Sequence, residues 1–220
     1  PPGRSSYPGD IFHVHASLLE RAGNVNTGDK NASITALPVA NTLENDISGY
    51  VQTNLMAITD GHIFFDSDNF RKGIRPAIDV FLSVSRVGNQ TKKPLDRNIA
   101  QLLRRKMGEY NRALEIAQFG VELPEETRNI IDFGEKLENI FTQPTDVLLS
   151  REFQLLLIGL LITGYWEQDA PTEVQQEVAT LIERYQREEF SELEEQISEL
   201  QDFDKFKRVI KNSFSKVKEF

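Results

Sequence analysis

The sequence contains no cysteine, which excludes a disulfide framework and any metal site built on thiolates. It also lacks a run of about 20 apolar residues, the length that a membrane-spanning helix requires. The most apolar stretch, residues 153–162, is about half that length, and we interpret it as a buried core helix. These absences predict a soluble chain that is not itself inserted into a membrane.

Basic residues are scarce relative to acidic ones: 25 lysines and arginines oppose 34 aspartates and glutamates, which gives a formal net charge of −9. Nucleic acids and anionic lipids attract proteins chiefly through an excess of basic residues. The composition therefore excludes them as bulk electrostatic partners, and we expect no nucleic-acid partner. Any site for an anion has to be local.

Several catalytic motifs are absent as well. The 220 residues contain no Gly-x-x-x-x-Gly-Lys-Ser/Thr loop, whose successive backbone N–H groups would hold nucleotide phosphates. The histidines, His13, His15 and His62, have no carboxylate or cysteine partner at the spacing of metal ligands, so we expect no metal site. The chain alone is therefore not expected to contain a complete active site.

The residues that are present follow two successive patterns, the first of which is typical of an α/β fold and covers residues 1–92. Asp10 is placed to cap a helix over residues 11–22, which Gly23 ends. Three short apolar runs are bounded by Gly, Asn and Asp and indicate buried strands of a mainly parallel sheet: residues 34–39, 55–59 and 81–85.

The second pattern, over residues 93–220, has helical spacing and predicts an all-α helical bundle. A linker over residues 88–94 joins the two parts. We expect helices over residues 96–119, 128–141, 150–165, 172–190 and from 191 to the C-terminus. The last two are rich in Glu, Lys and Arg, which is typical of a solvated helix face.

Three segments in the first 88 residues together resemble a known family. Residues 1–12 read PPGRSSYPGDIF, with LLERA at 18–22; residues 35–39 and 53–64 read TALPV and TNLMAITDGHIF; residues 72–80 and 82–88 read KGIRPAIDV and LSVSRVG. In this order they are similar to runs of the alpha subunits of rotary F-type ATP synthases. These runs read PPGREAYPGD, TALPV with PTNVISITDGQIF, and KGIRPAINVGLSVSRVG. The SVSRVG signature separates alpha from beta subunits.

The resemblance implies a fold and a role. Residues 1–92 would be the C-terminal part of a RecA-like P-loop NTPase domain, and residues 93–220 the C-terminal helical bundle domain. The protein would be the regulatory, non-catalytic alpha subunit in a ring of alternating alpha and beta subunits. That ring performs ATP synthesis and hydrolysis coupled to ion transport.

The resemblance also implies partners and ligands. The subunit would form a hetero-oligomer with beta subunits and the central-shaft gamma subunit. It would be peripheral to the cytoplasmic face of a bacterial inner membrane, or to the organellar equivalent. The full-length assembled subunit would bind ATP or ADP with Mg, whereas the isolated chain is expected to bind neither and to be inactive.

Six residues match functional positions of the family. Arg86 would be an arginine finger that reaches the catalytic site of a neighbouring beta subunit, a task that suits a planar, permanently charged guanidinium. Ser85, Asp60 and Gly61 would contribute at the same alpha–beta interface, where glycine permits close backbone approach. Arg75 and Pro76 would line the adenine side of the subunit's own non-catalytic nucleotide site.

From the residues alone, other interpretations stay open. Arg86 could instead form a salt bridge at a strand end, and Arg75 with Pro76 could be a turn at the entry to a strand, with proline restraining the backbone. The sequence also departs from the family. Ala57 replaces a usual serine, residues 40–43 read ANTL for IETQ, residues 91–94 read TKKP for QTRAMK, and Gln143 alone remains of a glutamine-rich stretch.

These departures support an alternative function. The chain would then be a non-enzymatic, diverged or truncated alpha-like interaction module that binds a protein partner through its helical bundle. A vacuolar-type B subunit fits less well, because the PPGR and SVSRVG runs match alpha subunits better.

Overall fold

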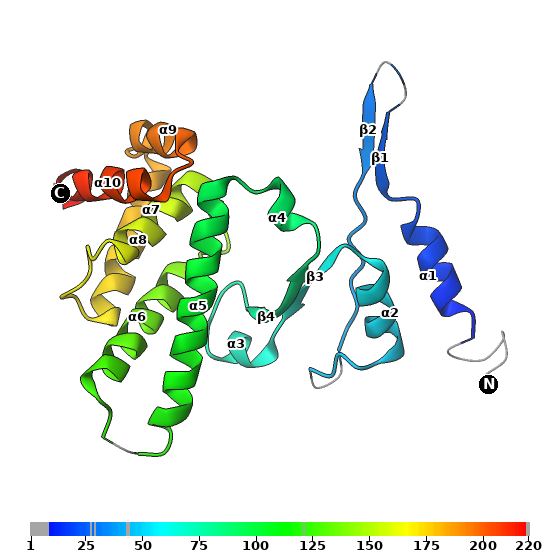
Figure 1. The fold of residues 1–220 in the computed structure, drawn as a ribbon, viewed down its shortest axis with the longest axis horizontal. Coiled ribbons are helices and arrows are strands. Elements are labelled where there is room, and N and C mark those ends of the chain that lie inside the picture. The colour runs from blue at the N-terminus through cyan, green and yellow to red at the C-terminus, as the bar shows by residue number, and fades with distance from the viewer. Residues whose placement is uncertain (1–8, 27, 29, 43–44, 121, 219–220) are drawn as a thin grey trace. The chain divides into compact units, whose positions relative to one another are not determined.

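A computed structural model of the chain describes residues 9–26, 28, 30–42, 45–120 and 122–218. The described residues form two compact units. The first runs up to Ser67 and includes Ile78–Asn89, and the second contains Asp68–Ala77 and the chain from Gln90 onward. Figure 1 shows the elements of each unit.

The first unit contains two helices and two antiparallel strand pairs. In chain order they are α1 (Ile11–Leu19), β1 (Gly23–Asn26), β2 (Asn31–Ile34), α2 (Tyr50–Ile58), β3 (Gly61–Phe65) and β4 (Ile78–Ser85). The strand β1 pairs with β2, and β3 pairs with β4 (Figure 1). The short helix α4 (Gly88–Thr91) follows β4 and crosses into the second unit.

The prediction of a mainly parallel sheet is wrong for these strands, because both pairs are antiparallel. Only residues 27–30 connect β1 to β2, whereas parallel strands need a crossover of about a dozen residues or more. The run 81–85 forms a strand within β4, as predicted, but the expectation that it is buried is wrong, because Phe81, Leu82 and Val84 are 40%, 43% and 45% exposed.

Two other strand predictions are wrong. Residues 55–59 lie mostly in α2, where Val51 and Leu55, four residues apart on one helix face, are both half-buried. A short apolar run has the same composition in a buried strand and in a helix, so composition did not separate them. Residues 35–39 are in neither helix nor strand, and Val39 is 91% exposed. No strand of the described part accepts their backbone hydrogen bonds.

The first predicted helix is shorter than expected. It ends at Leu19 and continues only as a turn to Arg21. Asp10 occupies the position before the helix, as expected, but its side chain accepts no hydrogen bond from the first turn. The capping contribution expected of Asp10 is therefore missing from this structure.

The second unit is helical. Its elements are α3 (Ser67–Arg71), α5 (Pro94–Ala117), α6 (Glu125–Phe141), α7 (Arg151–Ile162), α8 (Pro171–Gln186), α9 (Ser191–Glu199), α10 (Phe203–Asn212) and α11 (Phe214–Lys218). Local capping explains several boundaries. The Ser150 hydroxyl accepts the Phe153 N–H at 3.0 Å at the start of α7, and Pro171 stands at the first position of α8.

The predicted helices 96–119, 128–141, 150–165 and 172–190 are confirmed as α5 to α8 with shifted ends. The single helix predicted from residue 191 is wrong, because the chain forms α9, α10 and α11 there. The Asp202 carboxylate accepts the Lys205 N–H at 2.8 Å and so caps the separate helix α10. The cap begins a new helix after α9 has ended at Glu199, although the charge pattern of the sequence continues through both helices.

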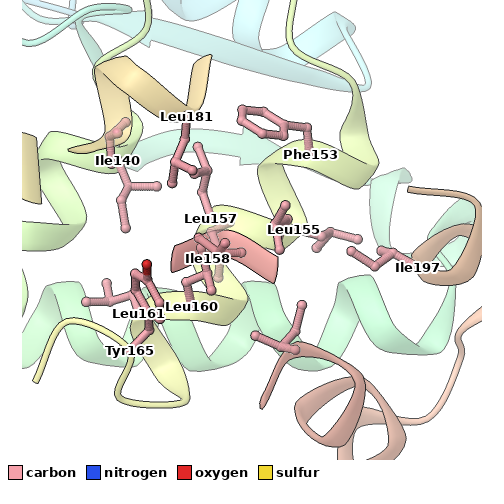
Figure 2. Packing of buried hydrophobic residues seen from close by; sticks show 14 of the residues in the cluster. Ile140, Phe153, Leu155, Leu157, Ile158, Leu160, Leu161, Tyr165, Leu181 and Ile197 are labelled. Carbon is pink, nitrogen blue, oxygen red and sulfur yellow. The ribbon is translucent and has the colours of Figure 1, made fainter. Parts of the chain in front are cut away.

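The helix α7 lies at the centre of the core. Figure 2 shows its side chains lying against Ile140 of α6, Leu181 of α8 and Ile197 of α9. Gly159 lets α10 come close, since a Cβ there would lie 2.8 Å from the Phe206 ring and 2.7 Å from Ile210. The prediction that residues 153–162 form a buried core helix is therefore confirmed.

Buried polar groups of the second unit are hydrogen-bonded. Lys136 is only 3% exposed. Its Nζ donates to the Trp166 carbonyl at 3.0 Å and pairs with the Asp132 carboxylate at 2.5 Å. Glu138 accepts the Tyr110 hydroxyl at 3.2 Å, and burial raises the pKa of that carboxyl group. These partners offset the cost of taking polar groups out of water.

No helix among the described residues combines the length and the apolar character needed to cross a bilayer.

Limited proteolysis tests the boundary near residue 92. Residues 89–94 are all exposed, and the division between the two compact units falls between Asn89 and Gln90 in the sequence, so a protease of broad specificity should cut within residues 88–94 as well as within the exposed, irregular residues 35–41. The helix α5 should be spared because Leu95 and Ile99 are buried. Mass spectrometry of the earliest fragments measures this, with a digest in urea as control. A first cut within α5 would show that the boundary is misplaced.

Candidate functional site

Four of the predicted site residues lie together at one end of the β3–β4 pair. Gly61 pairs with Ser85 in the strand register, and the Arg86 N–H donates to the Asp60 carbonyl at 2.8 Å. Asp60 and Arg86 therefore continue the pairing by one step beyond the two strands. The antiparallel geometry brings the chain segments 60–61 and 85–86 side by side although they are far apart in sequence.

Gly61 has no room for a side chain. A Cβ at this position would lie 2.5 Å from the Val84 carbonyl oxygen and 3.1 Å from the Ser85 Cα. Both atoms belong to the backbone, so a larger residue would push β4 away from β3. The close approach is between β3 and β4 of this chain, and it fixes the position of the residue that follows Ser85; the contribution of Gly61 at an interface with a beta subunit stays a prediction.

The Arg86 guanidinium caps the C-terminus of α2. Its Nη1 donates to the Ala57 carbonyl at 3.0 Å, and its Nη2 donates to the Met56 carbonyl at 3.1 Å. The last carbonyls of a helix have no partner within the helix and carry partial negative charge, which favours a cation. The two-pronged guanidinium is thereby held in one orientation while Arg86 stays exposed.

The salt-bridge interpretation of Arg86 receives no support. Within the part of the chain that the structure describes, no ion pair includes this side chain. Among the described residues, its side chain binds neutral carbonyl oxygens, which are weaker partners for a cation than a carboxylate. No acidic side chain in the described part of the chain therefore pairs with this exposed guanidinium.

Ser85 shapes the chain after Arg86. Its Oγ accepts the Gly88 N–H at 2.8 Å, which turns the backbone into α4 directly after the Arg86–Val87 step. Ser85 is exposed and has no basic neighbour that would activate its hydroxyl among these contacts. Its observed contribution is to the path of the backbone and not to nucleophilic chemistry.

Arg75 and Pro76 are not part of this group, since they belong to the second compact unit. The Arg75 Nη1 donates to the carbonyls of Phe70 and Ile74 at 2.8 and 2.9 Å, and its Cζ lies 3.6 Å from the centre of the Phe70 ring. The Arg75 carbonyl accepts the Gln143 N–H at 2.7 Å. These contacts agree with the turn interpretation, and the assignment to an adenine site stays a prediction.

Sequence reasoning missed three residues near the site: Asp79, Ser83 and the hydrogen-bonding role of His62. Their side chains bind backbone groups of β4 or β3, as do those of many residues in strands that bulge. The available signals for Asp79 and Ser83 were an acidic residue and a serine within the otherwise apolar strand β4. Aspartate is rare in strands, so its presence there indicates a local hydrogen-bond partner.

The arrangement has one chemical capability. It presents an exposed cation, held by two helix carbonyls, directly after the end of a strand. No cluster of His, Asp or Glu suited to a metal ion occurs among the described residues. A guanidinium of this kind can stabilise negative charge on a partner's phosphoryl oxygens but cannot by itself carry out hydrolysis.

Comparison with known proteins places these features in context. The family model for "ATP synthase alpha/beta family, nucleotide-binding domain" matches residues 1–85, and that for "ATP synthase alpha/beta chain, C terminal domain" matches residues 90–217. The chain is 37% identical over 217 residues to the ATP synthase subunit alpha of Petrotoga mobilis. That match covers 98% of this chain and 43% of the relative, so the chain spans less than half of the relative's length.

These matches confirm two predictions. The resemblance to alpha subunits is borne out by the relative, and the fold class is borne out by the two matched domains. The fold is the end of a nucleotide-binding domain followed by a helical C-terminal domain.

Proposed function

Because the chain belongs to the ATP synthase alpha/beta family, we propose that it acts within the regulatory, non-catalytic alpha subunit of a rotary F-type ATP synthase. In this role it helps to form the alpha/beta ring and supplies Arg86 to the catalytic site of a neighbouring beta subunit. The observation that carries the proposal is the exposed Arg86 guanidinium, which the carbonyls of Met56 and Ala57 hold in place without neutralising it.

The Arg86 guanidinium should exchange its carbonyl partners for phosphoryl oxygens when a nucleotide phosphate comes within reach. A phosphoryl oxygen carries negative charge, which grows in the transition state, and a guanidinium binds it more strongly than it binds a neutral carbonyl. Since Arg86 lies at the surface, little needs to be uncovered before it can leave α2. In the absence of a nucleotide phosphate, the carbonyls of Met56 and Ala57 then keep the Arg86 guanidinium in a defined orientation.

The remaining assignments follow from the same role. The assembled subunit would bind ATP or ADP with Mg. The residues Ser85, Asp60 and Gly61 would lie at the interface with the beta subunit. The helical unit would face the central-shaft gamma subunit. The complex would be peripheral to the membrane whose ion gradient it uses. Arg75 and Pro76 would contribute to the adenine side of the non-catalytic site.

Replacement of Arg86 by alanine in an assembled complex tests the role directly. Turnover should collapse while nucleotide affinity at the catalytic site is largely kept, because the contact is strongest in the transition state.

The 220-residue chain alone should bind ATP with a dissociation constant no tighter than about 1 mM, which corresponds to roughly −4 kcal/mol. Phosphate-binding loops hold nucleotides through backbone N–H groups, and these residues contain no such loop. Isothermal titration calorimetry measures the affinity, with an established P-loop ATPase as positive control. Micromolar binding would contradict the proposal that this chain holds no complete nucleotide site.

The alternative function is a non-enzymatic interaction module that binds a protein partner through its helical bundle. Phe119 and Leu148 in the helical unit are 82% and 94% exposed, but apolar residues that are exposed singly are common at protein surfaces and do not by themselves indicate a partner. The two functions differ in what they require of Arg86. An interaction module would be unaffected by Arg86→Ala, whereas an arginine finger would not.

A further inference from the structure

The strand β4 makes an excursion away from β3 just before it reaches the site. On the Arg86 side of the excursion, Gly61 pairs with Ser85 and His62 with Val84; on the other side, Phe64 pairs with Asp79. Between these pairs β3 contributes Ile63 alone, whereas β4 contributes residues 80–83. A bulge of this kind changes the direction in which the following side chains point.

Three side chains hold the excursion in one shape. The Asp79 Oδ1 accepts the N–H groups of Phe81 and Leu82 at 2.7 and 2.8 Å. The Ser83 hydroxyl donates to the Asp79 carbonyl at 2.5 Å and accepts the Phe64 N–H at 3.0 Å, which ties the excursion to β3.

The third member is His62, whose Nε2 donates to the Leu82 carbonyl at 2.8 Å from the opposite strand. We call the side chains of His62, Asp79 and Ser83 the β4 clasp. Together they bind backbone groups that an ordinary ladder would have paired, so the excursion leaves few polar groups without partners.

The register of β4 determines where Arg86 lies. Successive side chains of a strand point to opposite faces, so a slip of one residue in β4 would move Arg86 by about 3.3 Å and turn it to the other face. From that position its two nitrogens could not reach the Met56 and Ala57 carbonyls. The register Gly61–Ser85 is thus a condition for the present orientation of the guanidinium.

We propose that His62, Asp79 and Ser83 are positioning residues for Arg86, which act by fixing the register of β4 and have no contact with nucleotide. This inference rests on the proposed function of Arg86 as an arginine finger. It assigns to the clasp a role beyond stability, because the three side chains fix the register on which the position of Arg86 depends.

Kinetics of an assembled complex whose alpha subunit carries these 220 residues test the proposal. Asp79→Ala should slow turnover by at least about 10²-fold with little change in KM, since a misplacement of only about 1 Å of a catalytic group already has an effect of that size. Asp79→Asn is the matched control, because its amide oxygen can accept the same two N–H groups and should keep turnover near the wild-type rate. Ser83→Ala and Ser83→Thr form a second pair of the same design.

The decisive measurement repeats Asp79→Ala in an Arg86→Ala background. If the clasp acts through Arg86, the second substitution should cause no further loss of turnover. An equal loss in both backgrounds would overturn the positioning role. A different result, in which Arg86→Ala alone leaves turnover intact, would overturn the proposed function of Arg86 itself, so the two failures are distinguishable.

Hydrogen exchange on the 220-residue chain supplies a readout that needs no assembly. The Arg86 amide, which donates to the Asp60 carbonyl, should exchange at least about tenfold faster in Asp79→Ala and at the wild-type rate in Asp79→Asn. The amide of Leu157 in α7 is the internal control and should not change. Unchanged exchange at Arg86 in Asp79→Ala would show that the clasp does not set the register.

Discussion

Replacing Arg86 with alanine should slow ATP turnover by about 10³–10⁵-fold in the assembled complex, the range that arginine fingers contribute in related phosphoryl-transfer enzymes. This corresponds to roughly 4–7 kcal/mol of barrier. The guanidinium is planar and permanently charged, so it can contact two phosphoryl oxygens as it now contacts the carbonyls of Met56 and Ala57. Steady-state hydrolysis assays measure the effect.

Arg86→Lys should fail nearly as badly. An ammonium group keeps the charge but is a single point donor, so it cannot bridge two oxygens as the fork does. The folding of the chain should change little in either variant, because Arg86 is exposed.

Arg71→Ala is the matched control for these substitutions. Arg71 is an exposed arginine whose side chain pairs with the exposed Asp68 carboxylate at 3.2 Å, so turnover should stay near wild type. An Arg86→Ala complex that assembles and turns over within about tenfold of wild type, a difference of ~1.4 kcal/mol, would show that Arg86 is only a structural strand-end residue.

Phe206→Ala should lower the free energy of unfolding of the helical unit by about 3–5 kcal/mol, the usual cost of truncating a fully buried phenylalanine. The Phe206 ring has no exposed surface and lies against Gly159 of α7, where backbone and ring are already in close contact. Two packed helices cannot move together to fill the space that the ring leaves, so a cavity remains.

The protein's one tryptophan makes this measurable. Trp166 is 1% exposed and belongs to the same core, so its fluorescence during urea denaturation follows the helical unit alone. Phe203→Ala is the matched control: Phe203 is only half-buried and stacks on Phe206 at 6.4 Å, so its loss should cost clearly less. A loss below about 1.5 kcal/mol for Phe206→Ala would mean that the core collapses around the gap.

Much of the helical unit could be predicted because its signals are local. Apolar residues recur at helical spacing from Leu95 and Ile99 along α5, and Ser150 and Pro171 mark the starts of helices with their own side chains. The prediction failed where the determining contact was a cap hidden in a charged sequence, at Asp202, and where a short apolar run allowed two structures, in α2.

The site was found from sequence for a different reason. The TDG and SVSRVG runs resemble a known family, and this resemblance named Asp60, Gly61, Ser85 and Arg86 without any knowledge of how they meet. It could not reveal Asp79 and Ser83, because their importance lies in hydrogen bonds that β4 makes within its own excursion and to β3.

By itself, the sequence determined the helical character of the second unit, the absence of a phosphate loop and the identity of the cation at the site. Only the tertiary structure decided where that cation points. The Arg86 guanidinium binds carbonyls that lie 29 and 30 residues earlier in the chain, and the register that brings it there depends on a bulge between two antiparallel strands. No local pattern encodes such contacts, because a backbone carbonyl is the same group in every residue and only the fold selects which one becomes a partner.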